Sequence, residues 1–213
     1  VRAEHLDMIA AILEDAYTAR ATILDIGIGS GLVEELLLGR LPDVRFVGVD
    51  YSPAMLDLSR ARLAPFGERI RIVQHDLTDL ETLRLPAGDY QCAISVQTAH
   101  NLPPTCQRRL WTWLGRTLPT GALLLISDRI LPESAPLFGA YGSLWRRMEA
   151  LGAAPFDEGE TLEQHVQIAA RHGDTPAALS STLQWLRQAG FDAAILHVHA
   201  ERALVGCRKR PDA

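Results

Sequence analysis

Apolar positions along the chain follow two spacings, one typical of buried strands and one typical of amphipathic helices. Short apolar runs predict strands over residues 22–26, 44–49, 69–74, 89–95, 122–127, 191–199 and 202–208. Between them, apolar residues at helical spacing predict helices over residues 3–17, 31–40, 53–63, 104–118 and 176–189, with a shorter helical turn over 79–83. A strand-and-helix order that repeats in this way predicts a doubly wound α/β fold, a parallel sheet with helices on both faces.

The last two predicted strands are joined by only a residue or two near Ala200 and Glu201. So short a link predicts an antiparallel hairpin. We therefore expect a mostly parallel, seven-stranded sheet that ends in an antiparallel C-terminal hairpin.

Residues 132–175 interrupt the alternation with several prolines and glycines, and they contain two helical stretches, over 137–151 and 160–172. An insertion after the fifth strand leaves the sheet from its carboxyl edge, where a doubly wound fold binds its ligands. We therefore expect a single domain over residues 1–213, in which 132–175 form an inserted helical cap over the active site.

The clearest chemical signal follows the first strand, which runs into three glycines at alternate positions, Gly27, Gly29 and Gly31. Glycines allow positive φ and let a ligand approach the backbone without meeting a Cβ atom. The helix that follows has apolar residues at Leu32 and residues 36–37, and its free N–H groups point toward whatever lies over the loop. This strand, loop and helix predict a cradle for a nucleotide or nucleoside.

The amino-acid composition excludes several reaction mechanisms and argues against one class of partner. The chain has 213 residues, 47% of them hydrophobic, which is enough for a substantial core. The net charge of −5 argues against a polyanion as the main partner, although a local basic patch is compatible with it. Lys209 is the only lysine, so the sequence has no P-loop lysine, no Schiff-base lysine in its body and no Tyr-x-x-x-Lys pair.

Cysteine usage and hydropathy indicate the compartment. Cys92, Cys106 and Cys207 are scattered without a C-x-x-C pair, which fits a reducing cytosol better than a disulfide framework. No apolar run approaches 18 residues, and the first residues predict an amphipathic helix rather than a signal peptide. We therefore expect a cytoplasmic protein that does not span a membrane.

Acidic residues at predicted strand ends distinguish between cofactors. Asp50 ends the second strand, about twenty residues beyond the loop, where a carboxylate accepts ribose hydroxyls in dinucleotide-binding folds. The spacing G-x-G-x-G, with Leu32 in the sixth position, departs from the dinucleotide pattern G-x-G-x-x-G. Asp25 would repel a diphosphate but can face the ammonium group of a methionine moiety, and Asp76 can accept from an adenine amino group. Three carboxylates favour a cofactor with cationic groups.

The motifs resemble those of class I S-adenosylmethionine-dependent methyltransferases, over almost the whole chain. The matching segments are 24–31, 49–56, 75–77, 95–102, 118–124 and 185–191. Residues 132–175 are the divergent part, and Tyr90-Gln91 stands where the family often has Phe-Asp. The resemblance implies a Rossmann-like methyltransferase fold, S-adenosylmethionine as cofactor and S-adenosylhomocysteine as product. On the matching positions it implies a cofactor site made of Asp25, Gly27, Gly29, Gly31, Asp50, Tyr51, Met55, Asp76, Leu77, Ser95 and Gln97.

Methyl transfer is an in-line displacement, in which the protein mainly holds both reactants in register and excludes water. A general base is needed only when the acceptor arrives protonated. His100, just past the fourth strand, is the best placed candidate; Asp128, Tyr141 and His172 follow. The resemblance implies an enzyme, and their position along the chain makes these four residues the candidate catalytic groups.

The methyl acceptor is not encoded by any motif. The chain has no Asn/Asp-Pro-Pro-Tyr motif for methylation of the adenine amino group and no Pro-Cys pair for methylation of a cytosine carbon. Together with the acidic net charge, these absences favour a small-molecule acceptor, as in the small-molecule branch of the family. An RNA (a tRNA nucleoside) or protein acceptor and a non-catalytic cofactor-binding protein are the alternatives, and a homodimer is left open. His197-x-His199 places two imidazoles on one strand, but no third ligand follows at a useful spacing, so we expect no metal site.

Overall fold

The computed structural model describes residues 2–17, 21–131, 133–150, 164, 167, 171, 173–199 and 201–211. Its strands are β1 (Thr22–Ile26), β2 (Arg45–Asp50), β3 (Ile70–Gln74), β4 (Cys92–Val96), β5 (Leu123–Arg129), β6 (Phe191–His199) and β7 (Arg202–Lys209). Its α-helices are α1 (Arg2–Ala16), α2 (Leu32–Arg40), α3 (Pro53–Leu63), α4 (Pro104–Thr117), α5 (Phe138–Ala150) and α7 (Leu179–Gln188). The short 3₁₀ helices are η1 (Ala64–Arg69), η2 (Ala99–Asn101) and η3 (Ala135–Leu137).

The seven strands form one sheet in the order β3-β2-β1-β4-β5-β7-β6. The pairs among β1 to β5 are parallel, whereas β7 pairs antiparallel with both β5 and β6. The predicted fold class and the terminal hairpin are therefore confirmed. The strand order reverses between β1 and β4, which makes the carboxyl edge at that point the expected ligand site of a doubly wound sheet.

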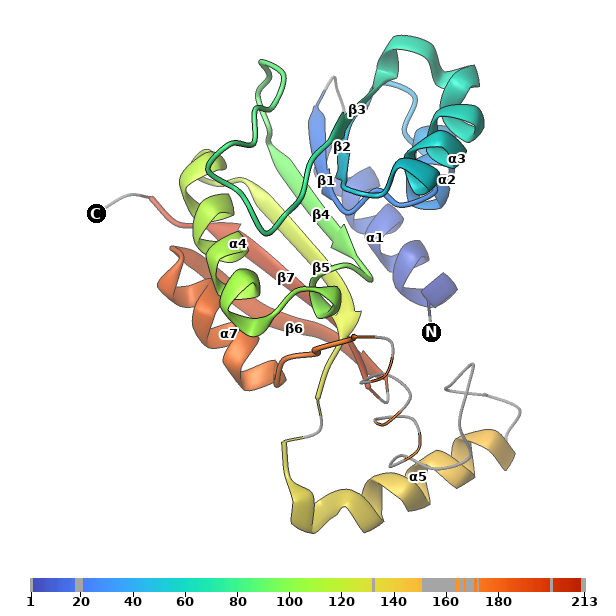
Figure 1. Cartoon of the computed structure of the whole chain (residues 1–213), viewed down its shortest axis with the longest axis vertical. Helices are drawn as coiled ribbons and strands as arrows, with labels where there is room; N and C mark the ends of the chain where they lie inside the picture. The colour runs from blue at the N-terminus through green and yellow to red at the C-terminus, as the bar shows by residue number, and fades with distance from the viewer. Residues whose placement is uncertain are drawn as a thin grey trace.

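Helices cover both faces of the sheet (Figure 1). α1, α2 and α3 pack on one face, where Ile23, Leu37 and Phe46 are almost fully buried. α4 and α7 pack on the other face, against Leu24 and its neighbours. Since the central strands are buried on both sides, they read as continuous apolar runs, which is why the sequence predicts them well.

Helix α2 buries only part of its apolar spacing. Leu37 is fully buried, whereas the side chains of Leu32 and Leu36 are 45% and 39% exposed. The buried residues of α2 are Val33, Glu34, Leu37 and Leu38. Leu32 lines a cavity, and an acidic residue, Glu34, is fully buried.

Three further boundaries differ from the prediction. The fourth strand begins at Cys92 rather than at residue 89, because 84–91 run as an irregular segment before the sheet. Residues 79–83 form turns rather than a helical turn. The last helix begins at Leu179 because Ala178 forms an isolated bridge with Leu131, which keeps the preceding backbone extended.

The segment after β5 leaves the sheet at its carboxyl edge, and α5 stands apart from the rest of the molecule (Figure 1). Two apolar residues of this segment, Leu137 of η3 and Leu144 of α5, are 53% and 63% exposed, so they are not packed in the core. The predicted second helix, over 160–172, lies mostly outside the described residues. Among the helices that the structure describes, none combines the length and apolarity needed to cross a bilayer.

Candidate active site

The glycine loop between β1 and α2 is fixed by backbone hydrogen bonds to the end of β2. The N–H groups of Gly27 and Ile28 both donate to the Val49 carbonyl, at 2.8 and 3.1 Å. Gly27 has a φ of 90°, and a Cβ there would lie 2.1 Å from Thr98 Oγ1. A side chain at this position is therefore excluded twice, by the backbone conformation and by the neighbouring segment after β4.

Asp50, at the end of β2, is held between the glycine loop and the start of α3. Its Oδ2 accepts from the Gly29 N–H and its Oδ1 from the Ser52 N–H, both at 2.9 Å. Ser52 in turn caps α3, accepting from the Met55 N–H, and Pro53 occupies the first helical turn. Each Asp50 oxygen keeps a lone pair free, so the carboxylate is oriented and still able to accept from a ligand.

These elements surround a cavity of about 600 Å³ at the carboxyl edge between β1 and β4. That volume lies within the range of small-molecule and cofactor sites. Tyr51 and Met55 at its rim are 68% and 45% exposed, an apolar surface that a bound ligand would cover. The lining residues are Gly27, Ile28, Gly29, Ser30, Leu32, Val33, Asp50, Tyr51, Ser52, Met55, Asp76, Leu77, Thr78, Val96, Gln97, Thr98, Asn101 and Leu102.

Most of the predicted cofactor residues line this cavity. They are Gly27, Gly29, Asp50, Tyr51, Met55, Asp76, Leu77 and Gln97. Gln97 has a φ of 55°, a left-handed conformation rare for a side-chain-bearing residue, and its N–H donates to the Ser127 carbonyl at 2.8 Å. Such strain concentrates at ligand sites, and here it turns the chain sharply at the end of β4.

Asp25, Gly31 and Ser95 do not line the cavity. A Cβ on Gly31 would meet Leu63 Cδ1 at 2.9 Å, so this glycine serves the packing of α2 against α3. Ser95 is fully buried in β4. Asp25 lies beneath the loop and is 1% exposed. The predicted contacts of these three residues with a cofactor stay predictions.

Asp25 shares its buried position with Glu34, which no motif singled out. Glu34 is 0% exposed, in the first turn of α2. Burial raises the pKa of Asp25 to about 6, an effect that a hydrogen bond from Glu34 opposes and the charge of Asp50 reinforces. Burial and the Asp25 charge raise the pKa of Glu34 well above its usual range. Asp25 and Glu34 therefore form a buried carboxyl pair, in addition to the Asp50 and Asp76 carboxylates that line the cavity.

His100 and Asp128 form a buried pair, as their neighbouring strand ends suggest. His100 Nδ1 lies 2.5 Å from Asp128 Oδ1, and the His100 N–H donates to Asp128 Oδ2. The two residues line a separate, small internal cavity between β5, α4 and α7 rather than the cavity at the glycine loop. His100 is 6% exposed. The pair therefore joins the segment after β4 to β5, and the predicted catalytic roles of both residues stay predictions.

Tyr141 lies on α5, half-buried and apart from the sheet. Tyr141 is not one of the described residues that line the glycine-loop cavity. His172 lies outside the described residues. Neither residue's predicted catalytic role is tested by this geometry, and both stay predictions.

One histidine of the terminal hairpin, His197, has a partner from the other end of the chain. His5 Nε2 lies 3.0 Å from His197 Nδ1, and His5 Nδ1 lies 2.8 Å from Ser127 Oγ. Burial, with the proximity of His197, lowers the pKa of His5 to about 4. Among the described residues, no group of three or more His, Cys, Asp and Glu has an arrangement that could hold a metal ion.

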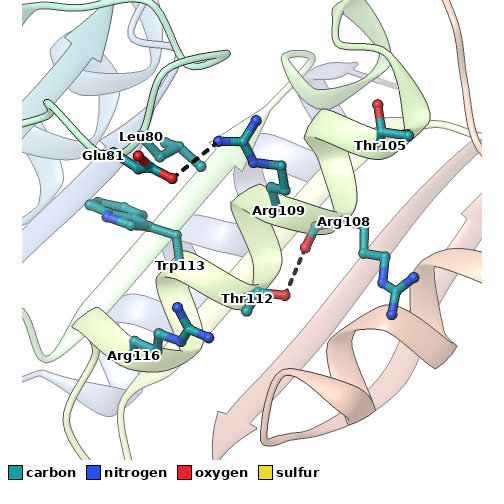
Figure 2. A pocket seen from close by; sticks show the side chains of 8 residues that line it. All are labelled: Leu80, Glu81, Thr105, Arg108, Arg109, Thr112, Trp113 and Arg116. Carbon is teal, nitrogen blue, oxygen red and sulfur yellow. Dashed lines mark hydrogen bonds and ion pairs between the residues drawn. The ribbon is translucent and has the colours of Figure 1, made fainter.

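A second concavity, of about 490 Å³, lies on the outer side of α4 (Figure 2). Arg109 and Trp113 face the Leu80–Glu81 segment, and an Arg109 nitrogen lies 3.9 Å from Glu81 Oε1. Arg108 extends from the opposite flank of the helix, so the guanidinium groups do not converge on one point (Figure 2). This groove is open and basic, and it differs in character from the acidic cavity at the glycine loop.

The lining of the glycine-loop cavity fits S-adenosylmethionine better than a dinucleotide. Its charged residues are Asp50 and Asp76, and the described residues that line it include no Arg, Lys or His. A diphosphate would find no counter-ion there, whereas a cationic ligand meets carboxylates. Asp50 offers oriented acceptors for a ribose diol, and the Asp76 carboxylate, held by the Thr78 N–H at 2.8 Å, lies beside the apolar rim.

Sequence reasoning missed the part of the lining that comes from the segment after β4. Thr98 contacts Gly27, and Asn101 and Leu102 close the same side of the cavity. Their signal was available in part, because a strand end next to the reversal of strand order is where ligands bind. Which side chains of that segment point into the cavity depends on the turn at Gln97, which the sequence does not indicate.

Comparisons with known proteins agree with this geometry. Residues 23–121 match the family model described as a methyltransferase domain. The ribosomal RNA small subunit methyltransferase H of a Nitratiruptor species is 33% identical over 84 residues, which are 39% of this chain and 28% of that protein. This chain therefore matches less than a third of that relative's length.

Two solved structures have the same fold. PigF with SAH is 23% identical, with a TM-score of 0.61, and the match covers 94% of this chain and 55% of that one. The mitomycin 7-O-methyltransferase MmcR is 18% identical, with a TM-score of 0.65, and the match covers 97% of this chain and 53% of that one. At these identities the likeness shows the fold alone. Residues 23–121 therefore resemble a methyltransferase domain, and the chain as a whole has the fold of these two solved structures.

Proposed function

We propose that the protein is an enzyme that binds S-adenosylmethionine in the glycine-loop cavity and transfers its methyl group to a small-molecule acceptor by in-line displacement. The observation that carries the proposal is the Asp50 carboxylate, held by two backbone N–H groups at the mouth of an acidic cavity. The cofactor supplies a methyl group activated by its bond to a sulfonium. The protein's part is to bind, orient and exclude water.

The roles of the lining follow from its chemistry. Asp50 accepts the two ribose hydroxyls with its free lone pairs. Asp76 accepts from the adenine amino group, while Tyr51, Met55 and Leu77 cover the ring with apolar surface. The backbone of the glycine loop lets the methionine end approach without side-chain obstruction.

The small-molecule acceptor is supported by the charge around the cavity. Asp50 and Asp76 make the mouth acidic, which disfavours the phosphates of a nucleic acid. The net charge of the chain, −5, acts in the same direction. One fold neighbour, MmcR, is named a mitomycin 7-O-methyltransferase, and mitomycin is a small molecule.

An RNA acceptor is the second candidate, because one observation favours it. The groove on α4 presents Arg109, Arg116 and Trp113 on one side, and arginines beside an aromatic ring suit single-stranded RNA (Figure 2). The relative from Nitratiruptor is named as an RNA methyltransferase. The exposed Glu81 beside Arg109 weakens the basic field, so the groove is the weaker of the two arguments.

We propose that residues 132–175 form the cap that completes the acceptor site. We call the two ends of this insertion, residues 129–133 and 174–180, its neck. The neck is hydrogen-bonded to the segment that lines the cavity: the Thr175 N–H donates to the His100 carbonyl at 2.6 Å, and Thr175 Oγ1 donates to the Leu102 carbonyl at 2.6 Å. Arg129 also pairs with Asp174 across the neck. A movement of the insertion would therefore act on the wall of the cofactor cavity.

His100 and Asp128 then act as positioning residues. Their pairing fixes the turn after β4, and the His100 carbonyl holds the neck through Thr175. A base of this protein would have to lie on the acceptor's side, where Tyr141 and His172 are the candidates from the sequence. A cytoplasmic location, consistent with the free thiols of Cys92 and the other two cysteines, belongs to the same proposal.

The test of the proposed function is binding followed by turnover. Isothermal titration should show that the protein binds S-adenosylmethionine and S-adenosylhomocysteine and does not bind NAD. Incubation with methyl-labelled cofactor, a panel of small phenols, amines and carboxylates, and a total RNA preparation should label a small compound. Binding of NAD without binding of the methionine cofactor would refute the cofactor assignment, and labelling of RNA alone would replace the acceptor proposal.

A further inference from the structure

Two carboxyl groups lie directly beneath the glycine loop, on the two elements that the loop connects. Asp25 is in β1 and is 1% exposed, and Glu34 is in the first turn of α2 and is 0% exposed. The loop between them contributes Gly27 and Gly29 to the lining of the cofactor cavity. The pair therefore flanks the loop, on the strand that precedes it and on the helix that follows it.

The strand neighbours of Asp25 carry no polar side chain. Asp25 lies opposite Ile94 of β4 on one side and Gly48 of β2 on the other. The space over Gly48 is filled by Ile28, since a Cβ there would lie 2.3 Å from Ile28 Cδ1. Two ionised carboxylates in such a place would be strongly unfavourable.

The oxygens of the pair lack donors. Asp25 Oδ1 and both carboxyl oxygens of Glu34 are buried without a hydrogen-bond donor among the described residues. A proton on one carboxyl group supplies the missing donor, because a protonated carboxyl can donate to its neighbour. One proton therefore removes one charge and satisfies two of the oxygens together.

Glu34 is the residue that keeps the proton. Burial is the largest effect on its pKa, and the Asp25 charge adds to it, while its own backbone N–H at the helix N-terminus acts in the opposite direction. The pKa of Asp25 is about 6, with the Glu34 hydrogen bond lowering it and the Asp50 charge raising it. Near neutral pH the pair is then a neutral Glu34 and an ionised Asp25.

Helix capping does not explain the position of Glu34. A glutamate at the third position of a helix often reaches back to the N–H of the capping residue. Here that N–H belongs to Gly31 and donates to the Ile28 carbonyl at 3.0 Å. The next residue, Glu35, is exposed and pairs with Arg62, so the outward-facing acid of this turn is already provided.

We propose that Glu34 is a positioning residue for the cofactor: its protonated carboxyl donates to Asp25 and holds one carboxylate charge beneath the glycine loop for the cationic end of S-adenosylmethionine. The inference rests on the proposed function, because it assigns a role toward that cofactor. It makes Asp25 an electrostatic partner that acts through the thin loop rather than a direct ligand.

The proposal predicts how cofactor affinity depends on pH. A nearby cation favours the ionised form of Asp25, so the pKa of Asp25 is lower in the complex than in the free protein. Affinity is then complete above the free-protein pKa of about 6 and is lost as the pH falls below it. For one linked proton, the loss is at most about tenfold per pH unit.

The experiment measures the dissociation constant of S-adenosylmethionine by calorimetry between about pH 5 and 7, where the ligand's amino group stays protonated. The variants are Glu34→Gln, Glu34→Leu and, as a matched control, Glu35→Gln on the exposed side of the same turn. Glutamine cannot ionise and still donates, so Glu34→Gln should stay within about threefold of the wild type, with the same midpoint near pH 6. Leucine cannot donate, so Glu34→Leu should move the midpoint upward by about one unit, which weakens binding about twofold at pH 7 and about fivefold at pH 6.

Each outcome decides the proposal. If Glu34→Gln weakens binding by about tenfold or more, the charge of Glu34 matters, and the proposal is wrong whether or not Glu34→Leu folds. A wild-type affinity that does not change over this pH range, or a folded Glu34→Leu with an unmoved midpoint, would also overturn it. A purely structural Glu34 would change the thermal stability without moving the midpoint. Failure of the wild type to bind at pH 7 would instead refute the proposed function.

Discussion

The cofactor cavity and the inserted segment with α5 lie at the same edge of the sheet, but they are held in different ways (Figure 1). The wall of the cavity follows directly from strand ends: the Gly27 N–H binds the Val49 carbonyl, and Asp50 binds two backbone N–H groups. The insertion is attached through its neck, and apolar side chains such as Leu144 are exposed on α5. One region is built by the sheet, and the other is attached to it.

Hydrogen bonds at the neck join the two regions. The Leu131 N–H donates to the Ala177 carbonyl, and the Ser180 N–H donates to Glu133 Oε1, so both ends of the insertion meet beside β5. Gln107 Nε2 donates to the carbonyls of Leu102 and Thr175, which joins the cavity wall to the neck. The comparison suggests that cofactor binding depends on the sheet and acceptor choice on the insertion, and the predictions that follow test this division.

The largest effect is expected from shortening the insertion. Replacing residues 134–172 by a brief Gly/Ser linker leaves Glu133, Asp174 and the neck hydrogen bonds in place. We expect a folded protein whose affinity for S-adenosylmethionine stays within about tenfold, or 1.4 kcal/mol, and whose turnover is lost. Calorimetry, circular dichroism and a methyl-transfer assay measure the three quantities. Methylation of the same acceptor at a similar rate would show that the insertion is not the acceptor site.

The next largest effect is expected from the fixed carboxylate of the sheet region. Asp50→Ala removes two charge-assisted hydrogen bonds to ribose, worth about 1.5–3 kcal/mol each. Cofactor affinity should fall at least about tenfold. Asp57→Ala, an exposed acid on α3 that pairs with Arg60, is the matched control and should leave affinity unchanged. An unchanged dissociation constant in folded Asp50→Ala would refute the ribose assignment.

The same division explains what the sequence could predict. The glycine loop and Asp50 are local features, because each follows a buried strand within a few residues, and their place at the sheet edge follows from the parallel topology. The parallel character of the sheet and the terminal hairpin were equally accessible from the spacing of the elements. All of these belong to the region that the sheet builds.

Other features depend on how elements pack, which periodicity alone does not settle. In α2, Leu37 is buried but Leu32 and Leu36 are partly exposed, and the fully buried Glu34 is an acid that apolar spacing does not select. The burial of His100 is a second example. Its place after a strand end made it a candidate base, but only the packed structure shows its imidazole buried against Asp128.

A smaller effect is expected at the junction of the two regions. His100→Ala leaves Asp128 with the N–H groups of residues 100 and 129 but removes the imidazole. The free energy of unfolding should fall by about 1–3 kcal/mol, the cost of leaving a buried group underbonded. Turnover per folded enzyme should fall less than about tenfold, since a lost general base costs about 10²–10⁴-fold. Loss on that larger scale, with disappearance of a limb of the pH–rate profile, would make His100 the base after all.

The smallest effect is expected from the groove on α4, which belongs to neither region. Arg109 and Arg116 line the groove and not the cofactor cavity, and Arg109 lies 3.9 Å from Glu81 with both side chains largely exposed. Such pairs contribute about 0–1 kcal/mol. The double reversal Arg109→Glu, Arg116→Glu should therefore leave stability within about 0.5 kcal/mol. Cofactor affinity and turnover of a small acceptor should change by less than about twofold, well under 1.4 kcal/mol.

The same variant separates the two candidate acceptors. Fluorescence anisotropy with a short, labelled single-stranded RNA at low and high salt measures any phosphate-dominated binding. Arg60→Glu, an exposed arginine of α3 paired with Asp57, is the control for a non-specific change of charge. If the acceptor is small, the wild type and both variants should bind the RNA weakly and alike. If the wild type binds it tightly and only the α4 reversal loses at least about tenfold, the groove is an RNA site and the small-molecule proposal is wrong.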